Sequence, residues 1–94
     1  MAYLVTHFYA GGTEEQYRAV LSAAHPADGL PPGQTYHAAG PTEDGWLIVA
    51  VWDSKDAFDA FVTGALLPTL GRHSGGFTGP PQERAGPVVN LETA

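Results

Sequence analysis

GWLIVAVWDSKDAF, residues 45–58, holds the strongest strand signal of the chain, followed directly by the start of a helix. Residues 45–52 are apolar at odd and even positions alike, which is typical of a central strand covered on both faces. Ser54 is a favourable helix N-cap. The apolar residues after it form one helical stripe, namely Phe58, Phe61, Val62, Ala65, Leu66 and Leu70. The stretch therefore predicts a buried strand that leads into an amphipathic helix.

A second strand and helix are predicted ahead of this stretch. Residues 2–9 are rich in β-branched and aromatic side chains, and a Gly-Gly turn ends them. Thr13 and Gln16 form a T-x-x-Q capping box, which marks the start of a helix over residues 14–25. The buried stripe of that helix begins at Tyr17.

The remaining segments complete the pattern. Residues 34–40 predict a weaker strand, residues 71–86 a long loop rich in glycine and proline, and residues 87–91 a short last strand. Pro68 lacks the N–H that Gly64 would accept, so we expect a kink there. The order strand–helix–strand–strand–helix–strand is that of a ferredoxin-like α+β fold, with an antiparallel four-stranded sheet ordered 4-1-3-2. Residues 1–94 form a single domain.

Composition excludes several classes of function. Ten acidic and four basic side chains give a net charge of -6, which disfavours nucleic acid or an anionic membrane as partner. The chain has no cysteine, so neither disulfides nor thiolate chemistry are expected. We see no basic segment of the kind that begins a signal peptide. We also see no apolar run of about 20 residues, the length that a membrane-spanning helix needs. A cytoplasmic protein is the resulting expectation.

Two segments resemble a known family. Val51-Trp52-Asp53-Ser54-Lys55-Asp56-Ala57-Phe58 and the helix entry Gly12-Thr13-Glu14 resemble the antibiotic-biosynthesis-monooxygenase-like (ABM) branch of the dimeric α/β-barrel superfamily. The resemblance implies a homodimer in which two sheets form a barrel, with a pocket between each sheet and its helices. Physical arguments favour the same homodimer, because two helices cover only one face of a sheet and exposed edge strands invite pairing.

The resemblance does not carry a catalytic set with it. The Asn, Trp and His of the haem-degrading members align with Val5, Phe61 and Gly71, and none of the three matches. The polyketide oxygenases place an Asn four residues before a Trp, where this chain has Ile48 before Trp52. We expect a ligand pocket lined by Val5, Trp52, Phe61 and His73.

His7 is the first candidate for a catalytic base. Strand alternation puts it on one face with Tyr3, Val5 and Tyr9, and the resemblance turns that face to the pocket. Imidazole titrates near neutral pH and can take a proton from a phenol or an α-carbon. A structural histidine, bonded to a neighbour or placed in a dimer interface, is an equal alternative.

Tyr36 and His37 are the second candidates. Adjacent strand residues point to opposite faces, so only one of them can serve the pocket, and His37 would lie roughly 10 Å from His7 across the intervening strand. A structural role is the alternative for either residue. His25 is expected to cap a helix, and His73 either to cover the pocket mouth or to be solvated. The spacing of the histidines predicts no metal site.

The sequence therefore predicts a homodimeric protein that binds a small hydrophobic or aromatic, polyketide-like metabolite. If it is an enzyme, the expected chemistry is that of a cofactor-independent monooxygenase, with His7 as the base and Tyr36 or His37 orienting the substrate. An isomerase or cyclase would use the same base without oxygen. A non-catalytic binding or scaffold dimer is the alternative from a different class.

Overall fold

The computed structural model describes residues 1–24, 29–66 and 76–94. Its elements, in chain order, are β1 (Tyr3–Ala10), α1 (Glu14–Ala24), β2 (Gln34–Thr42), β3 (Gly45–Trp52), α2 (Lys55–Phe61), a π-helical turn (Val62–Leu66) and β4 (Gln82–Pro87). The strands form one sheet in the order β2-β3-β1-β4, and each neighbouring pair is antiparallel. The predicted ferredoxin-like α+β fold and its strand order are confirmed.

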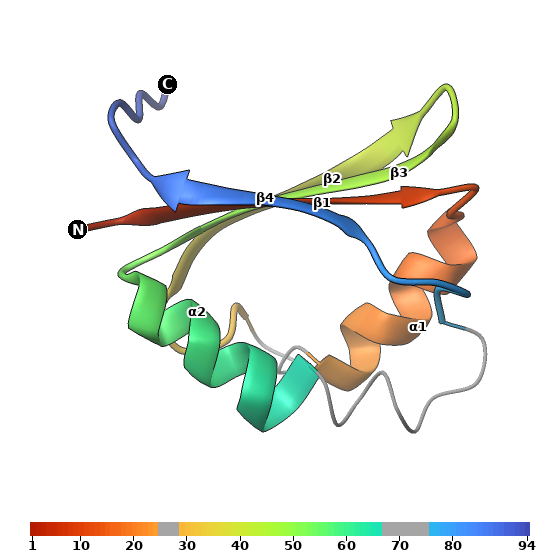
Figure 1. Cartoon of the computed structure of the whole chain (residues 1–94), viewed down its shortest axis with the longest axis horizontal. Coiled ribbons are helices and arrows are strands. Elements are labelled where there is room, and N and C mark those ends of the chain that lie inside the picture. The colour runs from red at the N-terminus through yellow and green to blue at the C-terminus, as the bar shows by residue number, and fades with distance from the viewer. Residues whose placement is uncertain (25–28, 67–75) are drawn as a thin grey trace.

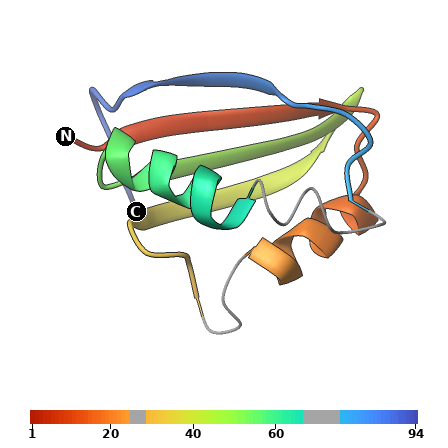
Figure 2. The same cartoon turned by 60° about the horizontal axis from the view of Figure 1, so that its bottom comes forward.

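Both helices lie on the same face of the sheet (Figure 1). Turning the molecule brings α2 in front of the strands, with α1 beside it (Figure 2). No helix of the described segments lies on the opposite face, so these segments form two layers rather than three. In the described ranges, no helix is long and apolar enough to cross a membrane.

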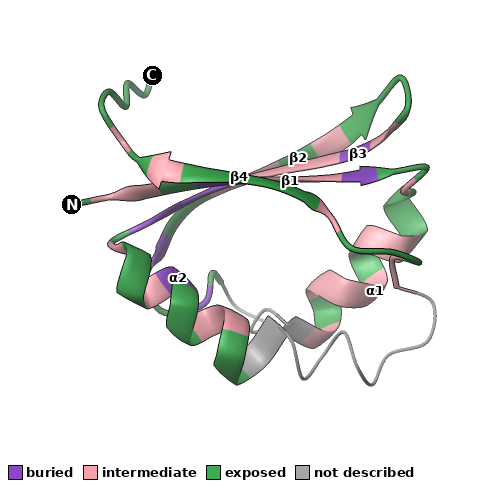
Figure 3. Ribbon diagram, in the orientation of Figure 1, coloured by how far each residue is buried: buried purple, intermediate pink, exposed green. Residues whose placement is uncertain are grey.

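The core lies where the middle of the sheet meets α2. Val5 of β1, Ala50 and Trp52 of β3, and Phe58 of α2 form one buried cluster, and the buried segments of the sheet lie mainly on β1 and β3 (Figure 3). Trp52 is only 1% exposed, and its ring centre lies 5.7 Å from that of Phe58 and 5.0 Å from that of Phe61. A side chain of this size contributes more than the roughly 1.5–3 kcal/mol of a buried aliphatic one.

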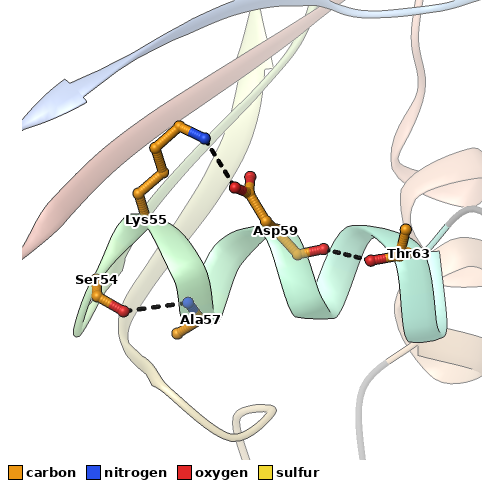
Figure 4. Close-up of polar contacts among 5 residues, drawn as sticks. All are labelled: Ser54, Lys55, Ala57, Asp59 and Thr63. Atoms are coloured by element: carbon orange, nitrogen blue, oxygen red, sulfur yellow. Dashed lines mark hydrogen bonds and ion pairs between the residues drawn. The ribbon is translucent and has the colours of Figure 1, made fainter.

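Both predicted helix caps are present. Gln16 N–H donates to Thr13 Oγ1 at 3.2 Å, and Thr13 N–H donates back to Gln16 Oε1 at 3.0 Å, as in a capping box. Figure 4 shows the start of α2, where Ala57 N–H donates to Ser54 Oγ at 3.1 Å. These bonds satisfy amide groups that the first helical turn leaves without partners.

The α-helix α2 ends earlier than the sequence predicts, at Phe61, and a π-helical turn follows it. Thr63 Oγ1 donates to the carbonyl of Asp59 at 2.6 Å (Figure 4), and a π-helical turn begins at Val62. Such a back-bond from a threonine competes with the helical ladder and often bends a helix. Pro68, where the sequence predicts a kink, lies outside the described residues, so that kink stays a prediction.

The prediction of the last strand was wrong. It forms from residues 82–87, which overlap the predicted strand only at residue 87 and otherwise lie in the segment expected to be loop. Val89 is 95% exposed and belongs to no strand. β4 pairs with β1 alone. An edge strand needs hydrogen bonds on one side only, so it tolerates the charged residues, glycine and proline of QERAGP.

We predict that Gly33→Ala destabilises the domain. Gly33 has φ +87°, and a Cβ there would lie 2.7 Å from the Cβ of Ala57 in α2. Backbone strain and overpacking each cost roughly 1–3 kcal/mol, and each kcal/mol lowers the Tm of a domain of this size by about 4–8 °C. Thermal unfolding followed by circular dichroism measures the effect. Gly79→Ala is the control, because a Cβ at that position would meet nothing within 4 Å; an equal Tm for both variants would refute the close contact.

Candidate functional site

A cavity of about 60 Å³ lies between the sheet and the helices. Its floor is the helix-facing side of β1, β2 and β3, and its walls come from α1, α2 and the segment before β4. The lining is mostly apolar and aromatic, with Val5, His7, Tyr9, Tyr17, Val20, Leu21, Gln34, His37, Ile48, Ala50, Trp52, Phe58, Phe61 and Phe77. Lysine and arginine are absent from this lining, so the described walls suit an uncharged or weakly acidic ligand.

His7 lies on the cavity wall and is held by a carboxylate. Its Nε2 lies 2.8 Å from Oε1 of Glu83, which is opposite His7 on β4. The side chain of His7 is 13% exposed and that of Glu83 is 50% exposed. A carboxylate only accepts hydrogen bonds, so Nε2 carries a hydrogen and the neutral ring keeps its lone pair on Nδ1. Among the described residues, Nδ1 has no hydrogen-bond partner.

A second imidazole lies on the other side of the cavity in a chain of hydrogen bonds. Nδ1 of His37 lies 2.9 Å from Oε1 of Gln34, and Nε2 lies 2.7 Å from the hydroxyl of Tyr17. Gln34 is only 8% exposed and is the one buried polar side chain in the described part of the chain. The Tyr17 ring also packs on Trp46, with 5.2 Å between ring centres. The ring of His37 is thus held at both nitrogens.

A β-bulge brings Gln34 and His37 to the same face. Residues three apart on a regular strand point to opposite sides of the sheet. Here the register shifts between Gln34, which pairs with Trp52, and Tyr36, which pairs with Val51. The extra residue, Thr35, restores both Gln34 and His37 to the face that carries the helices. Strand alternation alone does not predict this contact.

Some of the predicted site residues face the cavity and others do not. His37 faces the cavity, whereas Tyr36 is 44% exposed on the opposite face of the sheet. The suggestion that Tyr36 serves this cavity is corrected accordingly, because its strand neighbour His37 occupies the inward position. Val5, Trp52 and Phe61 line the cavity, and their contact with a ligand stays a prediction. His25 and His73 lie outside the described residues.

The hydrogen-bonding residues Tyr17, Gln34 and Glu83 of the site were not predicted, and Glu83 falls in the segment expected to be loop. Tyr17 looks like a member of the apolar stripe of α1, and Gln34 looks like the polar start of a weak strand. The only available signal was a hydroxyl within an otherwise apolar helical stripe.

The two imidazoles are separated by β3. His7 pairs with Ile48 and His37 pairs with Ala50 of this middle strand. Two strand spacings put their backbones roughly 10 Å apart, so they flank an apolar floor rather than contact each other. The arrangement offers a ligand one nitrogen base on the β1 side and a histidine–tyrosine pair on the β2 side.

Burial weakens the acidity of two tyrosines at the site. Burial, assisted by the charge of Glu83, raises the pKa of Tyr9, whose ring stacks on Phe77 with 3.7 Å between centres. Burial also raises the pKa of Tyr17, against a smaller opposite effect of Arg18. Both phenols are therefore neutral hydrogen-bonding groups at neutral pH.

The indole N–H groups of the two tryptophans are further donors. Trp46 Nε1 and Trp52 Nε1 are buried without a hydrogen-bond partner in the described structure, and Trp52 lines the cavity. A buried donor without a partner is unusual and points to water or ligand nearby. In the same part of the chain, no group of three or more histidine, aspartate or glutamate side chains is placed to hold a metal ion.

Comparison with known proteins identifies the fold. No protein-family model and no curated protein matches the chain. Among solved structures, a candidate antibiotic biosynthesis monooxygenase from Chloroflexus aurantiacus aligns with a TM-score of 0.69 at 13% identity, covering 99% of this chain and 98% of that one.

Two further structures carry established names. The cofactor-independent oxygenase SnoaB from Streptomyces nogalater aligns with a TM-score of 0.59 at 20% identity, covering 98% and 94% of the two chains. The monooxygenase ActVA-Orf6 from Streptomyces coelicolor, in complex with nanaomycin D, aligns with a TM-score of 0.59 at 19% identity, covering 99% and 91%. The whole chain therefore has the fold of ABM-like proteins.

We predict that the folded state loses stability at alkaline pH, partly through Tyr9. Its pKa is raised above the ordinary 10.0, so the unfolded chain releases this proton first. The stability is complete below pH 10 and declines as the pH rises through the folded-state value. Thermal unfolding across this range should show a smaller decline for Tyr9→Phe, which keeps the ring stack. Ser22→Ala, which removes an exposed hydroxyl of α1 and keeps Tyr9, is the control; an unchanged decline in Tyr9→Phe would contradict the prediction.

Proposed function

We propose that this protein is a cofactor-independent monooxygenase that acts on a small hydrophobic, aromatic metabolite in the cavity between sheet and helices. The observation that carries the proposal is His7, held by Glu83 at the wall of an aromatic-lined cavity. SnoaB, described as a cofactor-independent oxygenase, and ActVA-Orf6, solved with nanaomycin D, support it through their shared fold.

His7 is the proposed general base. Nδ1 takes the proton of a phenolic hydroxyl, and Glu83 fixes the ring and balances the imidazolium that results. The electron-rich substrate anion then reacts with molecular oxygen. One oxygen atom enters the ring as a quinone oxygen and the other leaves as water, so the substrate itself supplies the electrons.

The cavity must widen to accept such a ligand. Pockets for drug-sized molecules measure roughly 300–1,000 Å³, whereas this cavity measures about 60 Å³. Phe77 lies on the segment that precedes β4 and lines the cavity. We expect its ring to move away from Tyr9 when a ligand enters.

We further propose that the functional unit is a homodimer joined through the open face of the sheet. That face carries Leu4, which is 39% exposed, and Tyr36, which is 44% exposed, on the two sides of Val51 in β3. Val49 lies two residues further along β3 on the same face, between Thr6 and Ala38. The helices cover the other face only (Figure 1). A second copy would bury this apolar surface, as the family resemblance implies.

A binding or scaffold dimer without catalysis is the second candidate. The chain has Ile48 where the polyketide oxygenases have an asparagine, and the rings of Trp52 and Phe61 pack against each other at the cavity, with 5.0 Å between their centres. An isomerase or cyclase that uses His7 without oxygen is a third reading of the same geometry.

Oxygen uptake tests the proposed activity. Purified protein is offered a panel of dihydroxyaromatic substrates, and the rate is compared among wild type, His7→Ala and the surface control Ser22→Ala. Removal of a general base should lower kcat by roughly 10²–10⁴-fold, with the control unchanged. Equal uptake by His7→Ala would reject His7 as the base and keep the oxygenase. Background uptake with every compound would favour the binding protein or the isomerase.

Sedimentation velocity tests the homodimer. We expect wild type to sediment as a dimer and Val49→Asp as a monomer, because a charge buried in an apolar interface costs several kcal/mol. Ser22→Asp introduces the same charge on the exposed surface of α1 and should leave the dimer intact. A monomeric wild type, or a dimeric Val49→Asp, would refute this interface.

A further inference from the structure

We propose that Gln34, His37 and Tyr17 form a proton relay, in which the Tyr17 hydroxyl accepts a proton from a phenol or enol of the ligand and passes its own proton to His37. The inference rests on the proposed function for its substrate class. It assigns the cavity a second proton acceptor, on the side of the floor opposite His7.

The hydrogen bonds set the direction of the relay. An amide oxygen only accepts, so Oε1 of Gln34 requires a hydrogen on Nδ1 of His37 at 2.9 Å. A neutral imidazole with Nδ1–H has its lone pair on Nε2. The Tyr17 hydroxyl, 2.7 Å away, therefore donates to Nε2. His37 is oriented by one neighbour and poised to take a proton from the other.

Tyr17 can face His37 and a ligand at once. A phenol oxygen donates one hydrogen bond and accepts two, so the atom that donates to His37 can accept from a ligand hydroxyl. Tyr17 lines the cavity, and its ring is held against Trp46. Tyr17 and His37 therefore border the same ligand space, and the hydroxyl of one contacts the imidazole of the other.

The transfer balances without a tyrosinate. The ligand O–H bond breaks as a Tyr17 O–H bond forms, and the original Tyr17 proton moves to Nε2 of His37. The electron pair stays on the ligand oxygen, and the positive charge resides on the imidazolium, whose Nδ1–H remains bonded to Gln34. Burial raises the pKa of Tyr17, which agrees with a tyrosine that conducts a proton and stays neutral.

Gln34 acts as a positioning residue. It is nearly buried, and the bulge at Thr35 aims it at His37 rather than at the open face. Bulges often re-aim side chains beside active sites. A neutral amide orients the ring without adding the negative charge that would favour a resting imidazolium.

Nitrogen NMR of the free protein tests the relay without any substrate. Long-range proton–nitrogen correlation at neutral pH should show His37 protonated on Nδ1 and unprotonated on Nε2, with its signals assigned from His37→Asn. Gln34→Leu removes the orienting acceptor and should populate the Nε2–H tautomer. A wild-type His37 protonated on Nε2 would reverse the bond to Tyr17 and overturn the relay.

Binding of 4-nitrophenol tests the relay with a defined phenol, since its absorbance reports its own ionisation. Wild type should raise the fraction of nitrophenolate, and Tyr17→Phe, which keeps the ring packing, should lose that increase. Ser22→Ala, at an exposed position of α1 outside the cavity lining, should retain it. No increase with wild type, or the same increase with Tyr17→Phe, would overturn the proposal.

Measurements of kcat and KM distinguish a failure of the relay from a failure of the proposed activity. With an oxygen-consuming substrate, Tyr17→Phe should lower kcat by about 10²-fold or more with a smaller change in KM, and an unchanged kcat would count against the relay. If wild type consumes no oxygen, the proposed activity fails, and the tautomer and nitrophenol measurements still decide whether the relay exists.

Discussion

The pairing of β3 with strands on both sides is the constraint on which the site depends. β3 is the middle strand through which β1 and β2 are aligned, and its last residue, Trp52, lies at the centre of the core. Its register sets His7 opposite Ile48 and His37 opposite Ala50. A slip of one residue in either pairing would turn that histidine away from the helices. The burial of Trp52 thus stabilises the domain and fixes the spacing of two titratable groups.

The sequence was informative wherever one local rule determined the outcome. The capping box at Thr13 and Gln16 predicted the start of α1, and the two-sided apolar pattern of residues 45–52 predicted the central strand. Alternation along β1 placed His7 on one face with Tyr3, Val5 and Tyr9, and the family resemblance turned that face toward the pocket. Each of these inferences needed only a few neighbouring residues, because capping and strand alternation are local properties. The order of elements then left the ferredoxin-like arrangement as the natural topology.

Sequence reasoning failed where pairing partners, rather than local pattern, decided the structure. β4 forms from polar residues with a glycine and a proline because β1 offers it hydrogen bonds, while the apolar Val89 stays outside the sheet. The bulge at Thr35 has no local signature either, so the contact between Gln34 and His37 was not foreseen. Tyr17 was counted as part of an apolar stripe, since a helical pattern does not show what a hydroxyl will meet.

The two features that local rules missed are the ones that build the site. A polar edge strand brings Glu83 to His7, and a bulged strand brings Gln34 to His37. Each imidazole lies over an apolar floor, where a polar group without a hydrogen-bond partner would lower the stability of the domain. Each has such a partner, and the strand pattern of the sequence predicts neither of them. Proteins usually keep a structure that breaks the local sequence rules only at functional sites. The coincidence of both departures at one cavity therefore supports the proposal that a ligand binds in this cavity rather than on the open face of the sheet.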